Sequence, residues 1–250
     1  MPPLFPHPCR LFLFDLDGTL IDSKGDIASS VNLALARAGL SQLPPSRIAG
    51  FVGDGVRKLV DRSLREVLER GPDESLLLRV MDFYLDEYGQ HLLDTTRLFP
   101  GVGEALGSLD WAGLAVVTNK PERFSRQILN ALGIGRRFRL VLGGDSTPLR
   151  KPDPAPLLEA VDRCGAVPGD SVMVGDSPVD VQAGEAAGLV TCGIAANVVD
   201  KEKLRAAGCD LLISDMRELT LYFCPPSGTK ASASRNRSSP WNRNACNPRT

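Results

Sequence analysis

Residues 10–23 read RLFLFDLDGTLIDS, and this stretch decides the fold of the chain. The apolar run from Leu11 to Phe14 stops at Asp15, and a second acid, Asp17, follows closely. A short apolar run that ends in acids and glycine is typical of a buried strand that carries carboxylates to an open edge. Such carboxylates need a cation, a proton or hydrogen bonds, because burial of an unpaired carboxylate is costly. A strand capped by two incidental acids is the simpler interpretation, but it explains the D-x-D-G-T-L spacing poorly.

Further apolar runs alternate with helical patterns from residue 98 onward. We predict strands over 114–118, 140–142, 171–174, 189–194 and 210–213. Strands that alternate with helices predict an α/β fold in which a doubly wound parallel sheet is covered on both faces. Such sheets bind ligands beyond the carboxyl ends of their strands.

Residues 23–97 have a different pattern, with apolar residues at helical spacing and no clear strand. We predict helices over 26–38, 56–68 and 74–88, with a turn at Pro44-Pro45 between the first two. The chain therefore divides into an α/β core domain (1–22 and 98–224), an inserted all-helical domain (23–97) and a basic tail (225–250). The tail is rich in Ser, Asn, Pro and Arg and poor in apolar residues, which predicts disorder.

Composition limits the function classes. The chain has 250 residues and a formal net charge of -1, so no global charge favours nucleic acid or an acidic membrane surface. Its six cysteines form no C-x-x-C pair, which argues against a zinc site or a disulfide framework. We find neither a signal peptide nor a run of transmembrane length, and the expected location is the cytoplasm. The sequence leaves monomer and homodimer open.

Four motifs in order resemble those of the haloacid dehalogenase-like (HAD) hydrolase superfamily. Residues 15–23 match its first motif, DxDGTLxDS, in full. Thr118 in VVTNK, Lys151 in RKPDPAP and the G-D-x-x-x-D stretch from Gly175 to Asp180 match the second, third and fourth. A lone Thr, Lys or Asp at these positions would mean little, whereas the ordered set makes an accidental match improbable.

The resemblance implies phosphoryl transfer through a covalent enzyme intermediate. It assigns Asp15 as the nucleophile and Asp17 as the general acid and base. HAD dehalogenases lack an acid at the second position, so Asp17 argues for a phosphatase. Thr118 and Lys151 complete the implied catalytic set, and phosphoryl oxygens are expected to bind Thr118, Asn119 and the backbone amides near Leu16 and Asp17.

The implied cofactor is Mg²⁺, which prefers hard oxygen ligands. The expected ligands are the Asp15 carboxylate, the Asp17 backbone carbonyl and the Asp176 carboxylate. Asp180 is expected as a neighbour of the metal or as an occasional ligand.

The helical insertion is similar to the C1 cap of the superfamily, which implies that it closes over the site and contacts the substrate. The candidates for this contact are the glycine-rich loop 50–55 and the cations after it, Arg57 and Lys58, which suit a carboxylate-bearing substrate. An interpretation in which these glycines only shape a turn and both cations are solvated is equally open.

Among HAD enzymes, the motifs are most similar to those of phosphoglycolate phosphatases. This implies that the partner is a small phosphate ester, 2-phosphoglycolate. N-acetylmuramate-6-phosphate phosphatases and pyrophosphatases share nearly all of these features, and a β-phosphoglucomutase fits less well. A non-catalytic binding module on a HAD scaffold is the alternative of another class, but such a module would be expected to have lost Asp15, Asp17 or Lys151.

Overall fold

The computed structural model describes residues 5–195 and 198–226, and its centre is a parallel sheet of six strands in the order β6-β5-β2-β7-β8-β9. β2 (Leu11–Phe14) lies in the middle, paired with β5 (Gly113–Val117) on one side and β7 (Ser171–Gly175) on the other. The outer strands are β6 (Leu140–Leu142), β8 (Val190–Ile194) and β9 (Leu211–Ile213). Every pairing in this sheet is parallel, which confirms the predicted fold class.

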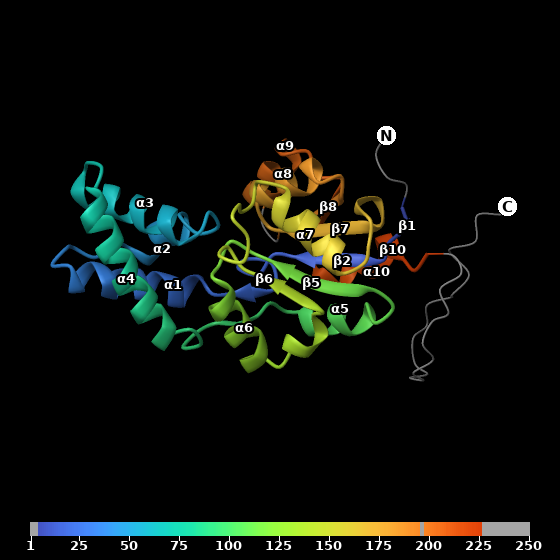
Figure 1. The fold of residues 1–250 in the computed structure, drawn as a ribbon, viewed down its shortest axis with the longest axis horizontal. Helices are drawn as coiled ribbons and strands as arrows, with labels where there is room; N and C mark the ends of the chain where they lie inside the picture. The colour runs from blue at the N-terminus through green and yellow to red at the C-terminus, as the bar shows by residue number, and fades with distance from the viewer. Residues whose placement is uncertain (1–4, 196–197, 227–250) are drawn as a thin grey trace.

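The central strands are buried on both faces. Phe12 and Phe14 point into one apolar cluster, whereas Leu11 and Leu13 point into another. This two-sided burial explains why the strand reads as a continuous apolar run instead of alternating with polar residues. Helices cover the two faces, as Figure 1 shows. The first face is covered by α5 (Val102–Ser108), α6 (Glu122–Ala131) and α10 (Leu219–Tyr222), and the second by α7 (Ala155–Arg163) and α8 (Pro178–Ala186).

Shorter elements complete the core. α9 (Val198–Ala206) lies beside β8 and β9. β1 (His7–Pro8) pairs with β10 (Phe223–Cys224), so the two ends of the described chain lie together. The 3₁₀ turns are η1 (Gly135–Arg137), η2 (Pro168–Asp170) and η3 (Met216–Glu218). The predicted disordered tail lies outside the described residues from position 227 onward.

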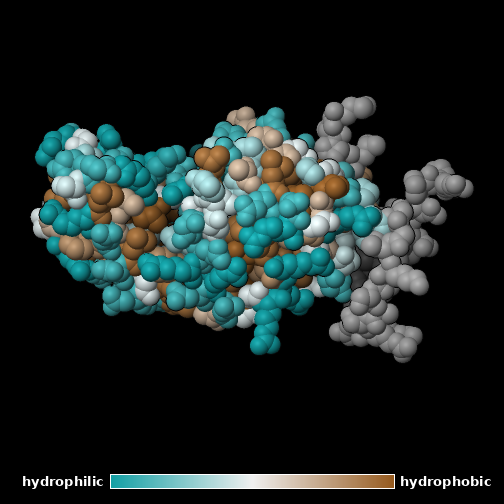
Figure 2. All heavy atoms as spheres, viewed as in Figure 1, coloured by the Kyte–Doolittle hydropathy of each residue, from teal (hydrophilic) through white to brown (hydrophobic). Residues whose placement is uncertain are grey.

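Four helices form the insertion that follows β2 and ends before α5, and they lie together at one end of the molecule (Figure 1). They are α1 (Lys24–Arg37), α2 (Pro45–Ala49), α3 (Val56–Leu68) and α4 (Glu74–Gln90). On the face drawn in Figure 2, hydrophilic residues cover most of both parts, and smaller apolar patches appear on both. The inserted helical cap of the predicted fold class is therefore present, whereas its exact bounds at 23 and 97 stay a prediction.

Two short elements within or beside this stretch were missed. The turn expected at Pro44-Pro45 is the start of α2, with Pro45 at its first position, where proline costs no hydrogen bond. The chain also enters and leaves the insertion through a small antiparallel pair, β3 (Ile21–Asp22) with β4 (Arg97–Leu98). Strands of two residues are too short to show the alternation of apolar and polar residues from which a strand is predicted.

The buried carboxylate of Asp26 links the segment where the chain enters the insertion to the segment where it leaves. Asp26, in the first turn of α1, is 2% exposed. It accepts the backbone N–H groups of Thr95 and Thr96 at 2.8 Å each and their hydroxyls at 2.5 and 2.7 Å. Desolvation raises the pKa of Asp26, but these hydrogen bonds outweigh it, and the pKa lies below its ordinary value. Asp26 therefore joins the first helix of the insertion to the two residues directly before β4.

We expect Asp26→Asn to lower the free energy of unfolding by about 2 kcal/mol at neutral pH, because it replaces hydrogen bonds to a charged acceptor and turns an amide N–H₂ toward other donors. The pKa of Asp26 is lower in the folded chain than the value of about 3.9 expected when unfolded. Its stabilisation is therefore complete above the unfolded value and is lost as the pH falls through the folded value. Urea denaturation of both proteins at neutral pH and near pH 3 checks this: the difference should shrink at the lower pH. A difference that stays constant with pH would contradict the assignment.

Candidate active site

The loop after β2 lies against the end of β7 and the loop that follows it. The N–H of Asp15 donates to Val174 O at 2.9 Å, and the carbonyl of Leu16 accepts the N–H groups of Leu20 and Ile21 at 2.9 and 3.1 Å. Gly18 has a φ of +90°, and a Cβ there would lie 2.1 Å from Asp176 Oδ2. Only glycine permits this approach, because an L side chain would be strained at that φ and would overlap the carboxylate.

Lys151 lies between two carboxylates at the carboxyl edge of the sheet. Its Nζ is 2.8 Å from Asp15 Oδ1 and 2.6 Å from Asp180 Oδ1, and the residue is 4% exposed. Burial by itself would lower the pKa of Lys151, but the charges of the two aspartates outweigh it and raise the pKa. Lys151 is therefore held as a buried cation against the predicted nucleophile.

The negative charges of Asp15 and Asp176 are not fully balanced by Lys151, and the pKa of each carboxyl is raised. Burial is the largest cause that raises the pKa of Asp15, to about 6, against the lowering effect of Lys151. Burial also raises the pKa of Asp176 well above its ordinary value, and the charges of Asp15 and Asp180 add to this. The protein thus concentrates more negative charge here than Lys151 can balance.

This donor set fits a hard divalent cation. One carboxylate oxygen each from Asp15, Asp176 and Asp180 lie within 4.8 Å of one another. All are oxygen donors, as Mg²⁺ prefers, and Gly18 leaves the space beside Asp176 clear of any side chain. Asp180 is the most engaged of the three, because its Oδ1 accepts from Lys151 and its Oδ2 accepts from the Ser177 hydroxyl at 2.7 Å.

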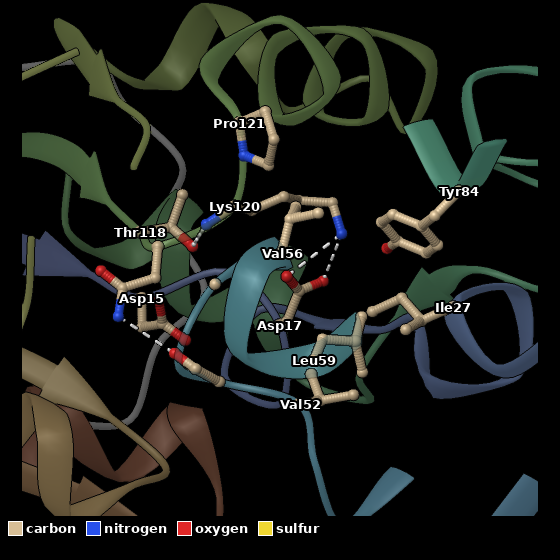
Figure 3. Close-up of a pocket in the computed structure, with 13 residues that line it drawn as sticks. Asp15, Asp17, Ile27, Val52, Val56, Leu59, Tyr84, Thr118, Lys120 and Pro121 are labelled. Atoms are coloured by element: carbon tan, nitrogen blue, oxygen red, sulfur yellow. Dashed lines mark hydrogen bonds and ion pairs between the residues drawn. The ribbon is translucent and has the colours of Figure 1, made fainter. Parts of the chain in front are cut away.

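Asp17 points away from this cluster and pairs with a different lysine. Lys120 Nζ lies 2.9 and 3.1 Å from the two carboxylate oxygens of Asp17. The hydroxyl of Ser23, the residue before α1, also donates to Asp17. Figure 3 shows the Lys120 side chain reaching from the turn after β5 to the Asp17 carboxylate. The side chains of the two predicted catalytic acids are thus held by separate lysines.

The end of β5 supplies polar groups beside Asp15. Thr118 is 4% exposed, and its Oγ1 accepts the N–H of Lys120 at 3.2 Å. The Asn119 amide nitrogen donates to the carbonyls of Gly53 and Lys151 at 3.0 and 2.9 Å. Its Oδ1 is buried without a partner in the described structure. The side-chain amide therefore ties the insertion to the core, and its donors are not free for a phosphoryl oxygen as the sequence had suggested.

A pocket separates this edge from the helical insertion. It has about 430 Å³ of empty volume, including space open to solvent. Its lower wall is formed by Asp15, Asp17, Thr118, Asn119, Lys120 and Pro121. The insertion supplies Ile27, Val52, Gly53, Gly55, Val56, Leu59 and Tyr84, a mostly apolar set (Figure 3). The arrangement therefore places charged groups on the core side of the pocket and mostly apolar groups on the side of the insertion.

Known proteins share this architecture. The family model described as haloacid dehalogenase-like hydrolase matches residues 12–194. The chain belongs to the haloacid dehalogenase-like hydrolases. It is 39% identical over 218 residues to the phosphoglycolate phosphatase of Nitrosospira multiformis, covering 86% of this chain and 96% of that protein. The corresponding enzyme of Chromobacterium violaceum is 38% identical over 208 residues, which cover 82% of this chain and 92% of the relative.

A solved structure extends the match to three dimensions. The crystal structure of a predicted phosphoglycolate phosphatase from Haemophilus somnus superposes on this hydrolase with a TM-score of 0.76 at 32% identity, covering 85% of this chain and 96% of the other. The predicted resemblance to the HAD superfamily is confirmed. No helix in the described ranges is both long and apolar enough to cross a bilayer.

Two cap residues predicted for this hydrolase lie elsewhere. Arg57 pairs with Glu74 at 2.7 Å and Lys58 lies 3.9 Å from Asp54, with side chains 49% and 60% exposed. Neither lines the pocket, because Val56 and Leu59 turn the inner face of α3 toward it. In this structure both cations belong to the solvated face of the helix, and their contact with the substrate stays a prediction.

Sequence reasoning also missed two partners of Asp17, Lys120 and Ser23. Both residues stand inside the motifs already quoted, Lys120 at the end of VVTNK and Ser23 at the end of the first motif. Ser23 stands six positions after Asp17, so its contact could have been suspected from the first motif, whereas the contact of Lys120 could not. The contact itself joins residues 103 positions apart, so only the pairing of β2 with β5 brings Lys120 and Asp17 together.

Proposed function

We propose that this hydrolase is a Mg²⁺-dependent phosphatase that converts 2-phosphoglycolate to glycolate and phosphate. The observation that carries the proposal is the buried cluster in which Lys151 binds Asp15 at 2.8 Å and Asp180 at 2.6 Å. Of these three residues, Asp15 lines the pocket. The relatives from N. multiformis and C. violaceum, both named phosphoglycolate phosphatase, support the choice of substrate.

In the first step, a carboxylate oxygen of Asp15 attacks phosphorus while the bond from phosphorus to the glycolate oxygen breaks. Asp17 gives a proton to the departing oxygen, so glycolate leaves as an alcohol. In the second step, Asp17 takes a proton from a water molecule, whose oxygen attacks the aspartyl-phosphate. The bond between phosphorus and Asp15 breaks, and phosphate is released. Covalent catalysis of this kind divides one difficult displacement into two easier ones.

Fixed donors around Asp15 would bind the phosphoryl oxygens. Lys151 supplies a buried cation, and the hydroxyl of Thr118 supplies a donor beside it. The backbone N–H groups of Leu16, Asp17 and Asn119 have no acceptor among the described residues, which suits a role as phosphoryl donors. For Asn119 this assigns the backbone instead of the side chain.

The carboxylates of Asp15 and Asp176 and the backbone carbonyl of Asp17 would hold Mg²⁺. When bound, the ion supplies positive charge between the nucleophile and the phosphoryl oxygens, which would otherwise repel each other. Asp180, whose oxygens already accept from Lys151 and Ser177, orients Lys151 and would be a neighbour of the ion.

The lining of the pocket favours a small substrate. The side chains that the insertion contributes are mostly aliphatic, and they offer few hydrogen-bond partners for the hydroxyls of a sugar. This supports 2-phosphoglycolate over N-acetylmuramate 6-phosphate.

Phosphate release from a substrate panel tests the proposal. We expect kcat/KM for 2-phosphoglycolate to exceed the values for N-acetylmuramate 6-phosphate, pyrophosphate, sugar phosphates and nucleoside monophosphates by about 10²-fold or more. Chelation with EDTA should lower the rate by roughly 10³-fold, and added Mg²⁺ should restore it. A preference for another ester would support the proposed phosphatase mechanism but contradict 2-phosphoglycolate as the substrate. No metal-dependent release from any ester would instead favour the binding module.

A further inference from the structure

The pocket contains a single cation in the part of the chain that the structure describes. Of the side chains that line it, only Lys120 is positively charged, whereas Asp15 and Asp17 are acidic. Lys151 lies behind Asp15, between this acid and Asp180. When the phosphoryl group of a bound molecule lies at Asp15, Lys120 is therefore the cation available to the rest of that molecule.

Lys120 has a rigid base and a charged end that is held by few groups. Its N–H donates to Thr118 Oγ1 at 3.2 Å, and its carbonyl accepts the N–H of Gly144 at 2.9 Å. The Nζ lies 4.5 Å from the centre of the Tyr88 ring, and the residue is 7% exposed. A buried ammonium needs a nearby anion, and in this structure Asp17 is that anion.

We propose that Lys120 binds the carboxylate of the substrate and that, in doing so, it exchanges its partner Asp17 for that carboxylate. The inference rests on the proposed function, in which the substrate is an acid whose carboxylate is attached to the carbon that bears the ester oxygen. Arg57 and Lys58 do not line the pocket that such a molecule would enter. Lys120 lines it together with Asp15 and already contacts Asp17 there.

The exchange links recognition to catalysis. In the structure, both oxygens of Asp17 are engaged by Lys120. When the substrate carboxylate takes over the ammonium, Asp17 is released to turn toward the leaving oxygen. An alkyl phosphate without a carboxylate cannot make this exchange, so it leaves Asp17 bound to Lys120. The ion pair thus discriminates against esters without an acid group, because a charge left without its partner in a desolvated pocket is costly.

A rival cation lies at the rim. The guanidinium of Arg150 comes within 3.1 Å of where a Cβ of Gly55 would stand, and its side chain is exposed. Gly55 lines the pocket, so Arg150 is the alternative residue that could bind the substrate carboxylate. Its exposure to water makes it the weaker candidate, because solvent screens its charge.

The test compares two substrates that differ in the acid group alone. Values of kcat/KM are measured with Mg²⁺ for 2-phosphoglycolate and for ethyl phosphate, in the wild type and in Lys120→Met, Lys120→Arg, Arg150→Met and Lys203→Met. Lys203, on α9, pairs with Asp200 on the surface and serves as the matched lysine control. We expect a preference of about 10²-fold or more for 2-phosphoglycolate in the wild type, which Lys120→Met reduces to within about threefold. Lys120→Arg should keep most of the preference, and Arg150→Met and Lys203→Met should keep all of it.

The outcomes separate the possible errors. A Lys120→Met protein that loses rate equally on both substrates would overturn the inference, because Lys120 would then act only by positioning Asp17. Loss of the preference in Arg150→Met instead would also overturn it. A wild type without preference for 2-phosphoglycolate would refute the proposed function, and the inference with it.

A binding measurement tests the same inference without turnover, in case the Lys120→Met variant is inactive. In an Asp15→Asn background, titration calorimetry with Mg²⁺ should detect 2-phosphoglycolate binding that Lys120→Met weakens at least tenfold. Binding of ethyl phosphate should change by less than threefold in the same pair. Equal weakening of both ligands would overturn the inference, and a thermal melt of each variant confirms that the protein is folded.

Discussion

Asp15→Asn should lower kcat for phosphate release by roughly four to six orders of magnitude, as loss of a nucleophile does in other covalent enzymes. The amide has the shape of the carboxylate but cannot form the aspartyl-phosphate. The fold should survive, because Lys151 keeps Asp180 at 2.6 Å and the backbone N–H at position 15 keeps its bond to Val174.

The measurement is steady-state phosphate release with Mg²⁺, together with a thermal melt. Asp170→Asn is the matched control, since Asp170 lies just before β7, at the opposite end of the strand from the site, and pairs with the exposed Arg10. Mass spectrometry should accompany the assay, because deamidation would regenerate the acid. Retention of more than about a hundredth of the wild-type rate by an intact Asn protein would remove Asp15 as the nucleophile.

Lys151→Met should affect stability as well as activity. The substitution leaves Asp15 and Asp180 facing each other in a buried cluster with Asp176 nearby and no cation between them. Removal of one partner from a buried ion pair typically costs about 3–5 kcal/mol, and we expect a loss of this size in the free energy of unfolding measured with EDTA present. Loss of the cation beside the phosphoryl group should also lower kcat by roughly 10³-fold.

Urea denaturation with EDTA and with Mg²⁺ checks the stability effect. Added Mg²⁺ should recover part of the loss, since a dication among the same carboxylates replaces the missing charge. Lys203→Met removes an exposed lysine and should change the stability by no more than about 1 kcal/mol in either buffer. A loss below about 1 kcal/mol for Lys151→Met in EDTA would mean that the carboxylates do not depend on this lysine.

The sheet and the position of the site could be predicted because both follow from local patterns. A run such as Leu11 to Phe14 is typical of a strand that is buried on both faces, as in a covered parallel sheet. Since parallel strands end at the same edge, Asp15, Thr118 and Asp176 had to converge once their strands were recognised. The structure places each of them directly after β2, β5 and β7.

Side-chain directions could not be predicted in the same way. Arg57 and Lys58 follow the glycine-rich loop directly, and their position in the sequence suggested a contact with the substrate. The helical repeat decides otherwise, because Val56, Leu59 and Val60 share the inner face and leave both cations on the outer one. Lys120 shows the reverse case. Its partner is fixed by strand pairing and by a tyrosine from α4, neither of which leaves a trace near position 120.

The two chain segments at the base of the insertion are held together, and this affects how such enzymes can acquire new substrates. Asp22 and Arg97 are already neighbours through β3 and β4, and Asp26 fastens the same place from inside. The entropy of closing a loop grows only slowly with its length, so the α/β core is nearly indifferent to how many residues lie between these two points. The insertion can therefore be lengthened, shortened or exchanged as a module. New substrate preferences can be acquired there without rebuilding the sheet edge that performs the chemistry.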